Sequence, residues 1–394
     1  MLDFLKDKAK CTGCGACQAS CPADCIVLKP DQEGFWYPEA TDACVHCNKC
    51  EKVCPVLNRE TEEQFHQPYA AVTKDYKIWK RSASGGAFSE ICFAFGDAET
   101  LVCGAAWNGL EVQYQTVMGV ENIAPLCKSK YVQSHPMQTF KEIKKHLDSG
   151  KKAIFCGTPC SVAGLNAFLG KAYPNLLTID LICHGVGSPA VFKDCMEVMG
   201  TQFGKKIKGY TFRAKRKAHE IDYLSHLAFA DGSAIYVQKD PYIQLFLSQD
   251  ALRPSCGENC AFRNTYRHGD ITIADFKGLS SVFPQLKFEK KNYSTIVFNS
   301  DKALLLREKL QKRMIMLKCT VEDVIKFNPL FAHHTKSSLT RDAFFEAYAT
   351  EGVEAIKKHT NPAKAYPYTL KRKVYDSIPV VLRKFLFNIC RGKK

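Results

Sequence analysis

Nine of the 20 cysteines in this 394-residue chain lie within the first 54 residues, and eight of these nine form two copies of one pattern. Each copy has three cysteines separated by two residues and then, after three more residues, a fourth cysteine followed by proline. The first copy ends at Cys21-Pro22 and the second at Cys54-Pro55. The chain is long and begins with charged residues rather than an apolar signal segment, so we expect reduced thiols that are available for metal.

This spacing is the bacterial ferredoxin pattern C-x2-C-x2-C-x3-C-P, whose last cysteine binds the other of two iron–sulfur clusters. Two residues between thiolates allow a tight turn around one face of a cluster, and Gly13 and Gly15 give the backbone freedom for it. A pair of zinc sites is the alternative, which the third cysteine and the trailing Cys-Pro disfavour. We predict two 4Fe-4S clusters, the first bound by Cys11, Cys14, Cys17 and Cys54 and the second by Cys44, Cys47, Cys50 and Cys21.

Beyond the cysteine-rich head, the sequence alternates between strand and helix patterns. Two strand–loop–helix units place Cys160 and Cys183 in the loops that follow short apolar strands. Such units predict an α/β (α+β) body with a mixed, mainly parallel sheet, which binds ligands at the carboxyl ends of its strands. The predicted strands are 101–107, 112–118, 153–156, 176–182 and 270–276, and the predicted helices are 87–95, 139–147, 162–169 and 189–199.

A third group of cysteines follows at Cys256 and Cys260. The C-x3-C spacing suits few sites, so the pair by itself is weak evidence. Together with Cys160 and Cys183, it could complete a third four-thiolate site. Four core thiols without a metal are the alternative, because free cysteine packs as a small hydrophobe. Cys25 matches no ligand position and is predicted to be a packing or surface residue.

Six short motifs give the chain a resemblance to the coenzyme F420 hydrogenase/dehydrogenase beta subunit family, including its shorter bacterial members. The resemblance covers the head and runs to about residue 280. Members of this family bind FAD and a further 4Fe-4S cluster, and they move electrons between iron–sulfur centres and an organic hydride carrier, often coenzyme F420. The motifs are Ser84-Gly85-Gly86, Ser129-Lys130-Tyr131-Val132-Gln133-Ser134, Gly157-Thr158-Pro159-Cys160, Cys183-His184-Gly185-Val186, Arg253-Pro254-Ser255-Cys256 and Asp270-Ile271-Thr272-Ile273.

The resemblance implies a third 4Fe-4S cluster on Cys160, Cys183, Cys256 and Cys260. It also implies FAD contacts, for which the candidates are Ser84, Gly85, Gly86, Lys130, Tyr131, Gln133, Ser134 and Thr158. A glycine turn that opens a helix offers backbone N–H groups to a pyrophosphate, although Ser84 could equally be a plain helix cap. Catalytic residues are not identified; the candidates are Lys130, His184 and Asp275.

The sequence departs from the family pattern at two places. Family members usually have C-x2-C after Arg-Pro-Ser, whereas three residues separate Cys256 from Cys260 here, and Gly257 could absorb the extra one. Members also tend to read Gly-Asp-Phe-Trp-Gly after the later strand, whereas this chain has Ala274-Asp275-Phe276-Lys277-Gly278. The second departure bears on the substrate more than on the flavin.

The net charge of +15 is unevenly distributed. A basic cluster begins at Arg213 and Lys215, and it is expected to be a solvated loop or a site for an anionic substrate. The tail from Ile378 to Ile389 has apolar residues at helical spacing among basic ones. This pattern predicts a helix that packs on the body, binds a partner or lies on an anionic membrane surface. Nucleic-acid binding is not expected, because no recognition motif accompanies the charge.

From these patterns we expect four parts: a ferredoxin-like domain with two clusters (1–60), the two parts of a flavin-binding body (61–170 and 171–345), and a basic amphipathic tail (346–394). The expected function is that of a cytoplasmic oxidoreductase, with possible contact at the inner face of the membrane. Electrons would pass from ferredoxin or another donor protein through the clusters and FAD to coenzyme F420 or another small hydride acceptor. The alternative is a non-catalytic electron-relay subunit of a larger redox complex.

Overall fold

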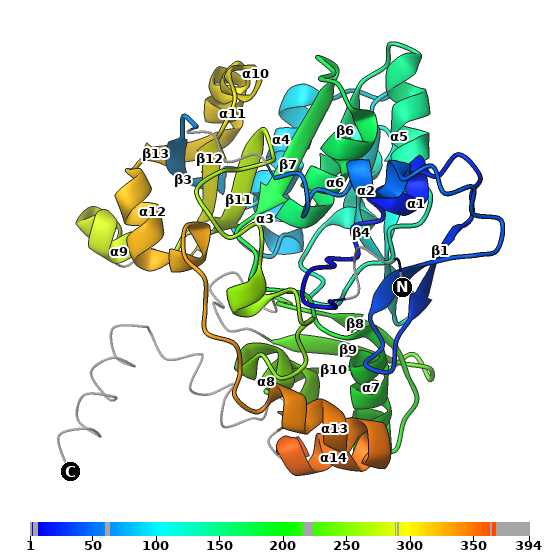
Figure 1. Ribbon diagram of the computed structural model, residues 1–394. Helices are drawn as coiled ribbons and strands as arrows, with labels where there is room; N and C mark the ends of the chain where they lie inside the picture. The colour runs from blue at the N-terminus through cyan, green and yellow to red at the C-terminus, as the bar shows by residue number, and fades with distance from the viewer. Residues whose placement is uncertain are drawn as a thin grey trace.

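The computed structural model describes residues 2, 7–59, 64–215, 224–287, 289, 291–362 and 365–367. The predicted tail helix at 378–389 and the end of the basic cluster after Lys215 lie outside these residues. The described chain forms a small cysteine-rich head, a large mixed sheet covered by helices, and a second antiparallel sheet (Figure 1). None of its described helices combines the length and apolar character that a membrane span needs.

The head consists of two short helices and one β-hairpin. Helix α1 (Ala16–Ser20) follows the first two cysteines and contains Cys17, and α2 (Lys49–Lys52) lies within the second group. Strands β1 (Ile26–Pro30) and β2 (Trp36–Ala40) pair antiparallel between them. Phe35 and Tyr37 at this hairpin are buried in an aromatic core that belongs to the body, so the head packs closely against the body.

The large sheet has the strand order β13-β3-β12-β11-β7-β6-β4-β5. Its four central strands pair parallel, and antiparallel strands flank them on both sides. The sheet is mixed, as predicted, but it has fewer parallel pairs than the sequence pattern indicates. Its strands are β3 (Gln67–Thr73), β4 (Leu101–Asn108), β5 (Glu111–Met118), β6 (Ala153–Cys156), β7 (Leu176–Leu181), β11 (Ile271–Asp275), β12 (Ser294–Phe298) and β13 (Met314–Lys318).

Helices cover both faces of this sheet, because alternate strand residues point to opposite sides. On β6, for example, Ile154 packs with α4 and α11, whereas Phe155 packs with α5 and α6. The sequence predicts these elements well: the observed bounds of α4 and β6 match the predicted ones. The helices around the sheet are α3 (Tyr76–Arg81), α4 (Ala87–Phe95), α5 (Thr139–Asp148), α6 (Pro159–Leu169), α9 (Leu279–Val282), α10 (Asp301–Leu304), α11 (Arg307–Arg313) and α12 (Val321–Phe327).

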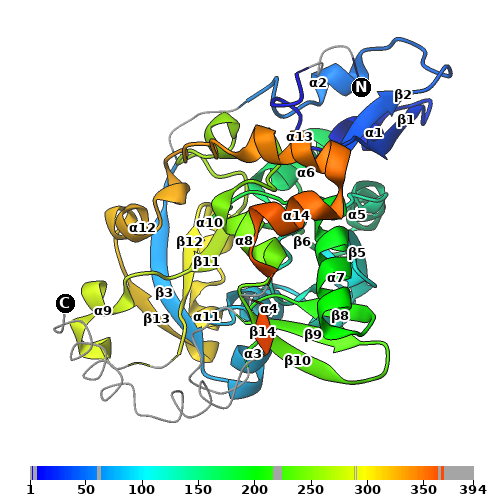
Figure 2. The ribbon, with the colours of Figure 1, turned by 90° about the horizontal axis from the view of Figure 1, so that it is seen from below.

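The second sheet has the strand order β14-β10-β9-β8 and is antiparallel. It packs with four helices, two from the middle of the chain and two that follow the large sheet in the sequence. Figure 2 shows α13 next to the head and α14 beside α7 and α8. Helix α13 spans residue 346, where we expect a boundary. The strands are β8 (Ile207–Thr211), β9 (Ser225–Phe229), β10 (Ala234–Gln238) and β14 (Tyr366–Pro367), and the helices are α7 (Pro189–Phe203), α8 (Pro241–Ser248), α13 (Arg341–Glu351) and α14 (Val353–His359).

Candidate functional site

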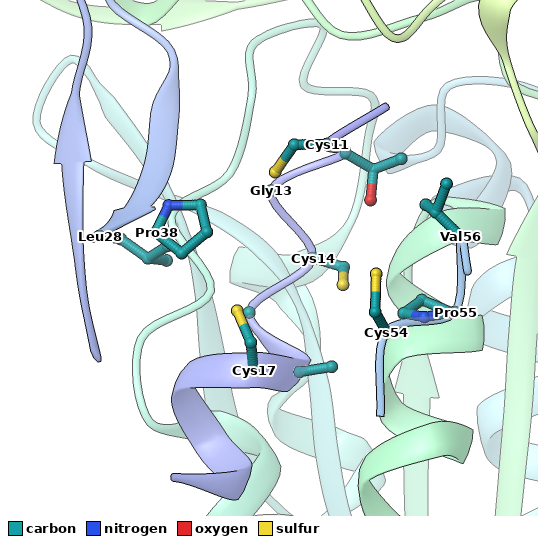
Figure 3. Close-up of a pocket in the computed structure, with 12 residues that line it drawn as sticks. Cys11, Gly13, Cys14, Cys17, Leu28, Pro38, Cys54, Pro55 and Val56 are labelled. Carbon is teal, nitrogen blue, oxygen red and sulfur yellow. The ribbon is translucent and has the colours of Figure 1, made fainter. Parts of the chain in front are cut away.

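The four cysteines predicted for the first cluster surround one small cavity of about 20 Å³. Figure 3 shows the side chains of Cys11, Cys14, Cys17 and Cys54 around this common space. Cys11 and Cys14 come from the loop before α1, Cys17 from the first turn of α1, and Cys54 from the end of the second cysteine group. Burial raises the pKa of Cys14 to about 12, so this thiol keeps its proton until a metal replaces it. The donor set and its enclosure fit a four-thiolate cluster.

Backbone geometry explains the glycines of this loop. Gly13 and Gly15 have φ values of +69° and +83°, which side chains rarely allow. A Cβ atom on Gly15 would also come within 2.8 Å of Pro136. Among the described residues, no three His, Cys, Asp or Glu side chains lie close enough to hold a single metal ion; a cluster of four irons spreads its thiolates over a wider cage.

Three of the four cysteines predicted for the second cluster pack in one group, which also includes Cys17 of the first set. Cys21, Cys44 and Cys50 pack together with Leu2 and Ile26, whereas Cys47 is exposed. Cys25 joins this group: it is buried, and its Sγ lies 3.3 Å from Sγ of Cys21. The second set is therefore nearer the molecular surface than the first.

A cavity of about 590 Å³ lies at the carboxyl ends of the central strands, within the range of roughly 300–1,000 Å³ that cofactor sites occupy. Three segments of the body bring Cys160, Cys183, Cys256 and Cys260 to its wall, close enough for their charges to interact. Helix α6 begins at Pro159, three residues earlier than predicted, because proline is favoured in the first turn of a helix. Cys160 is thus in a helical turn, not in a loop.

The extra residue between Cys256 and Cys260 is taken up by a single 3₁₀ turn. This turn spans Gly257–Asn259, and Gly257 has a φ of +71°. Both flanking thiols still face the cavity, so the unusual spacing does not separate them. The predicted role of Gly257 agrees with this geometry.

Seven of the eight flavin-contact candidates line the same cavity: Ser84, Gly86, Lys130, Tyr131, Gln133, Ser134 and Thr158. Gly85 packs behind the wall, where a Cβ atom would meet the carbonyl oxygen of Ala71 at 2.4 Å. The alternative role of Ser84 as a helix cap is wrong. Gly86 is the N-cap of α4, and Ser84 Oγ donates to the carbonyl of Tyr293 instead.

The wall near these candidates is positively charged. Burial lowers the pKa of Lys130 to about 8, although its Nζ donates to the carbonyls of Pro125 and Cys127. Lys215 is also buried; it donates to the carbonyls of Trp79 and Ser84, and its Nζ lies 3.9 Å from the Trp79 ring centroid. Burial lowers the pKa of Lys215 as well, to about 7. Lys215 is therefore not part of a solvated loop.

The other two catalytic candidates also reach the cavity. Asp275 forms an ion pair with Arg213, with 2.7 Å between the carboxylate and guanidinium. His184 Nε2 lies 3.3 Å from the carbonyl oxygen of Phe246, and burial lowers the pKa of its ring. Asp275 is thus neutralised by its partner, and His184 is held mostly uncharged at neutral pH.

Two buried side chains present unpaired N–H groups at the boundary between head and cavity. Arg253 is 1% exposed; its Nε donates to the carbonyl of Cys11 at 2.8 Å, whereas Nη2 has no partner among the described residues. Gln133 accepts from the backbone N–H of Trp36, and its Nε2 is likewise unpaired there. Unpaired buried donors are rare and costly, which fits a polar ligand in this cavity.

Sequence reasoning missed Arg253 as a site residue, and it left Lys215 open between a solvated loop and a site for an anionic substrate. Arg253 lies in the Arg-Pro-Ser-Cys motif, of which only the cysteine was assigned a function, and the motif itself could have identified the arginine. Lys215 lies in a run of basic residues that looks solvent-exposed. Nothing local distinguishes Lys215 from its neighbours, because its burial depends on contact with Trp79, far away in the sequence.

Comparisons with known proteins match two parts of the chain. Residues 150–323 match the family described as the C terminus of the coenzyme F420 hydrogenase/dehydrogenase beta subunit, and residues 10–58 match the 4Fe-4S dicluster domain. Over 54 residues the chain is 32% identical to an uncharacterized ferredoxin of Methanocaldococcus jannaschii, covering 14% of this chain and 70% of the relative.

Over 61 residues the chain is 40% identical to NADH-quinone oxidoreductase subunit I 2 of Geobacter metallireducens, covering 14% of this chain and 47% of the relative. A chain of the F420-reducing [NiFe] hydrogenase complex from Methanosarcina barkeri superposes with a TM-score of 0.43 and 15% identity, over 76% of this chain and 94% of that chain. The chain is therefore an iron–sulfur redox protein whose cavity-bearing segment matches the C terminus of the coenzyme F420 hydrogenase/dehydrogenase beta subunit family and whose head matches the 4Fe-4S dicluster domain.

Proposed function

We propose that this chain is an iron–sulfur flavoprotein oxidoreductase. Electrons from a donor protein such as reduced ferredoxin enter through the two head clusters, cross a third cluster and reach FAD. From there a hydride passes to an organic acceptor, coenzyme F420 or another small molecule. The observation that carries this proposal is the shared cavity: four cysteines, seven flavin-contact candidates and the head residues Thr12 and Gly13 all line it.

The residues of the cavity have distinct tasks in this proposal. Cys160, Cys183, Cys256 and Cys260 would hold the third cluster, and the turn at Ser84–Gly86 offers its backbone to a pyrophosphate at the start of α4. Lys130 places a positive charge where an anionic flavin would lie. Bound FAD would supply the conversion between single electrons and a hydride.

The proposal is tested by the iron and flavin content of protein purified without oxygen. We expect about twelve irons per chain, as three clusters of four, and about one flavin. The Cys160→Ala variant should lose about four irons and keep the head clusters. Cys195→Ala is the matched control, because Cys195 is a buried cysteine of α7 that does not line the cavity, and its removal should leave the iron count unchanged.

Two results would contradict the proposal. Colourless protein that contains zinc would exclude both clusters and flavin. About eight irons with no flavin would favour the alternative electron-relay subunit. The acceptor is then identified by mixing reduced protein with candidate molecules, starting with coenzyme F420, and following reoxidation of the flavin absorbance.

Lys130 predicts a pH dependence of flavin affinity. Its pKa of about 8 means that the ammonium is charged below pH 8 and is lost above it. We expect FAD to bind about tenfold more tightly at pH 7 than at pH 9, which corresponds to about one pKa unit of interaction. Titration of the flavin-free protein with FAD at both pH values measures this ratio, which the Lys130→Met variant should reduce towards one.

The pH dependence of the stability of the flavin-free protein provides a second check on Lys130. Its sign is opposite, because stability is expected to rise with pH where the affinity for FAD falls. The folded pKa of Lys130 lies below the unfolded value of 10.5, so the unfolded chain binds the proton more tightly. This group therefore adds stability as the pH rises from about 8 to about 10.5. Equal pH profiles for wild-type and Lys130→Met protein, in binding and in unfolding, would show that Lys130 does not act as an ionisable group here.

A further inference from the structure

The head and the body meet at a helical glycine. Helix α1 packs against α6, and the two elements lie side by side in Figure 1. A Cβ atom built on Gly164 of α6 would lie 2.9 Å from Sγ and 3.0 Å from Cβ of Cys14. Real Cβ atoms essentially never approach other atoms this closely, so only glycine allows Cys14 to rest here.

The same helix carries a cysteine of the third set. Cys160 precedes Gly164 by four residues, so the two lie on one face of α6, one turn apart. One turn of helix therefore separates a predicted ligand of the first cluster from a predicted ligand of the third.

Arg253 bridges the same boundary from another direction. Its Nε holds the carbonyl of Cys11, and its own carbonyl accepts from the N–H of Cys256 at 2.9 Å. Its charge also opposes the burial that raises the pKa of Cys160. A fixed cation thus lies between the first and third sets of cysteines. Three cysteines of the second set pack instead with Leu2 and Ile26, in a group that also includes Cys17.

From this geometry we infer that electrons pass between head and body from the Cys14 side of the first cluster to the Cys160 side of the third, and that Gly164 is the positioning residue that sets this gap. The inference rests on the proposed function and adds its internal route. The transfer oxidises the head centre by one electron and reduces the body centre by one, with no bond made or broken. The second cluster would then be the entry point, consistent with the exposure of Cys47.

The test uses the full chain reduced with dithionite and observed by electron paramagnetic resonance. Neighbouring reduced clusters split each other's signals, and the splitting weakens as the distance between them grows. The second cluster also splits the first, so the comparison is made in Cys47→Ala protein, which lacks the second cluster. There the Gly164→Ala side chain must push Cys14 away, so the splitting between first and third clusters should weaken. The matched control is Gly200→Ala, also inside a helix, where a Cβ atom would meet the carbonyl of Lys205 at 3.2 Å, away from the head.

A second variant, Cys47→Ala, removes the second cluster through an exposed residue. The split signal should survive in this protein. A first-to-third splitting that Gly164→Ala leaves unchanged in Cys47→Ala protein, or that is absent from Cys47→Ala protein itself, would overturn the route. Loss of about four irons from Gly164→Ala but not from Gly200→Ala would support the contact with Cys14, and Cys47→Ala then decides the route by itself. Wild-type protein without three clusters and flavin contradicts the proposed function instead, so the two failures are distinguishable.

Discussion

Replacing Asp180 with alanine is expected to lower the free energy of unfolding by about 3–5 kcal/mol, the usual cost of breaking a buried ion pair. Asp180 at the end of β7 is fully buried and lies 3.0 Å from Arg267, whose side chain is 1% exposed. Thr272 and the backbone N–H of Gly269 also donate to this carboxylate. Removing the carboxylate leaves the guanidinium charged, buried and without its partner. Urea unfolding of the two proteins measures the difference.

Asp231→Ala is the control for this variant. Its carboxylate pairs with Lys205 at 2.8 Å, but both side chains are largely exposed, and pairs of this kind contribute little. Because Asp180 precedes Cys183 by three residues, we also expect Asp180→Ala to lose iron from the third site at denaturant concentrations that the control tolerates. A loss of less than about 1 kcal/mol would show that the strand end does not depend on this pair.

The second large effect concerns the junction of head and body. Arg253→Met keeps an unbranched side chain but leaves the carbonyls of Cys11 and Trp36 without their donor. It also removes the guanidinium that stacks 3.9 Å from the Tyr37 ring centroid. Each hydrogen bond from a charged group contributes about 1.5–3 kcal/mol, so docking of the head should weaken by at least about 2 kcal/mol.

Hydrogen exchange measures this change directly. The amides of β2 should exchange about 30-fold faster in Arg253→Met, the factor that corresponds to about 2 kcal/mol, whereas those of β7 should be unaffected. Arg59→Met is the control: Arg59 is an exposed head arginine whose Nε donates to the carbonyl of Val56. Unchanged exchange in β2 would mean that the head is held by other contacts, such as the ion pair between Glu33 and Arg341.

Local patterns account for what the sequence predicts correctly. The bounds of β6 and α4 follow from short apolar runs and a glycine turn, and the enclosure of Cys11, Cys14 and Cys17 follows from their spacing. Each of these features depends on residues that are close together in the sequence. The grouping of Cys160 with Cys256, by contrast, comes from the family resemblance, because no periodicity reports which loops meet.

The remaining features depend on contacts between distant segments, which leave no local trace. The edge strands look like ordinary apolar runs, and only the folded sheet shows that they pair antiparallel. Lys215 is buried because Trp79 and Ser84 offer a ring and a carbonyl to it. The contact between Gly164 and Cys14 likewise joins a predicted helix to the first cysteine motif, and nothing in the sequence connects these two segments.

The placement of β3 within the large sheet has a consequence for biosynthesis. Tyr69 pairs with Ile296 on one side and with Lys318 on the other, so this early strand has no partner until nearly the whole body has left the ribosome. The head hairpin closes locally, with Ile26 opposite Ala40. Because domains of a nascent chain fold as they emerge, the ferredoxin-like segment is exposed to the cell's iron-delivery machinery well before its docking surface exists.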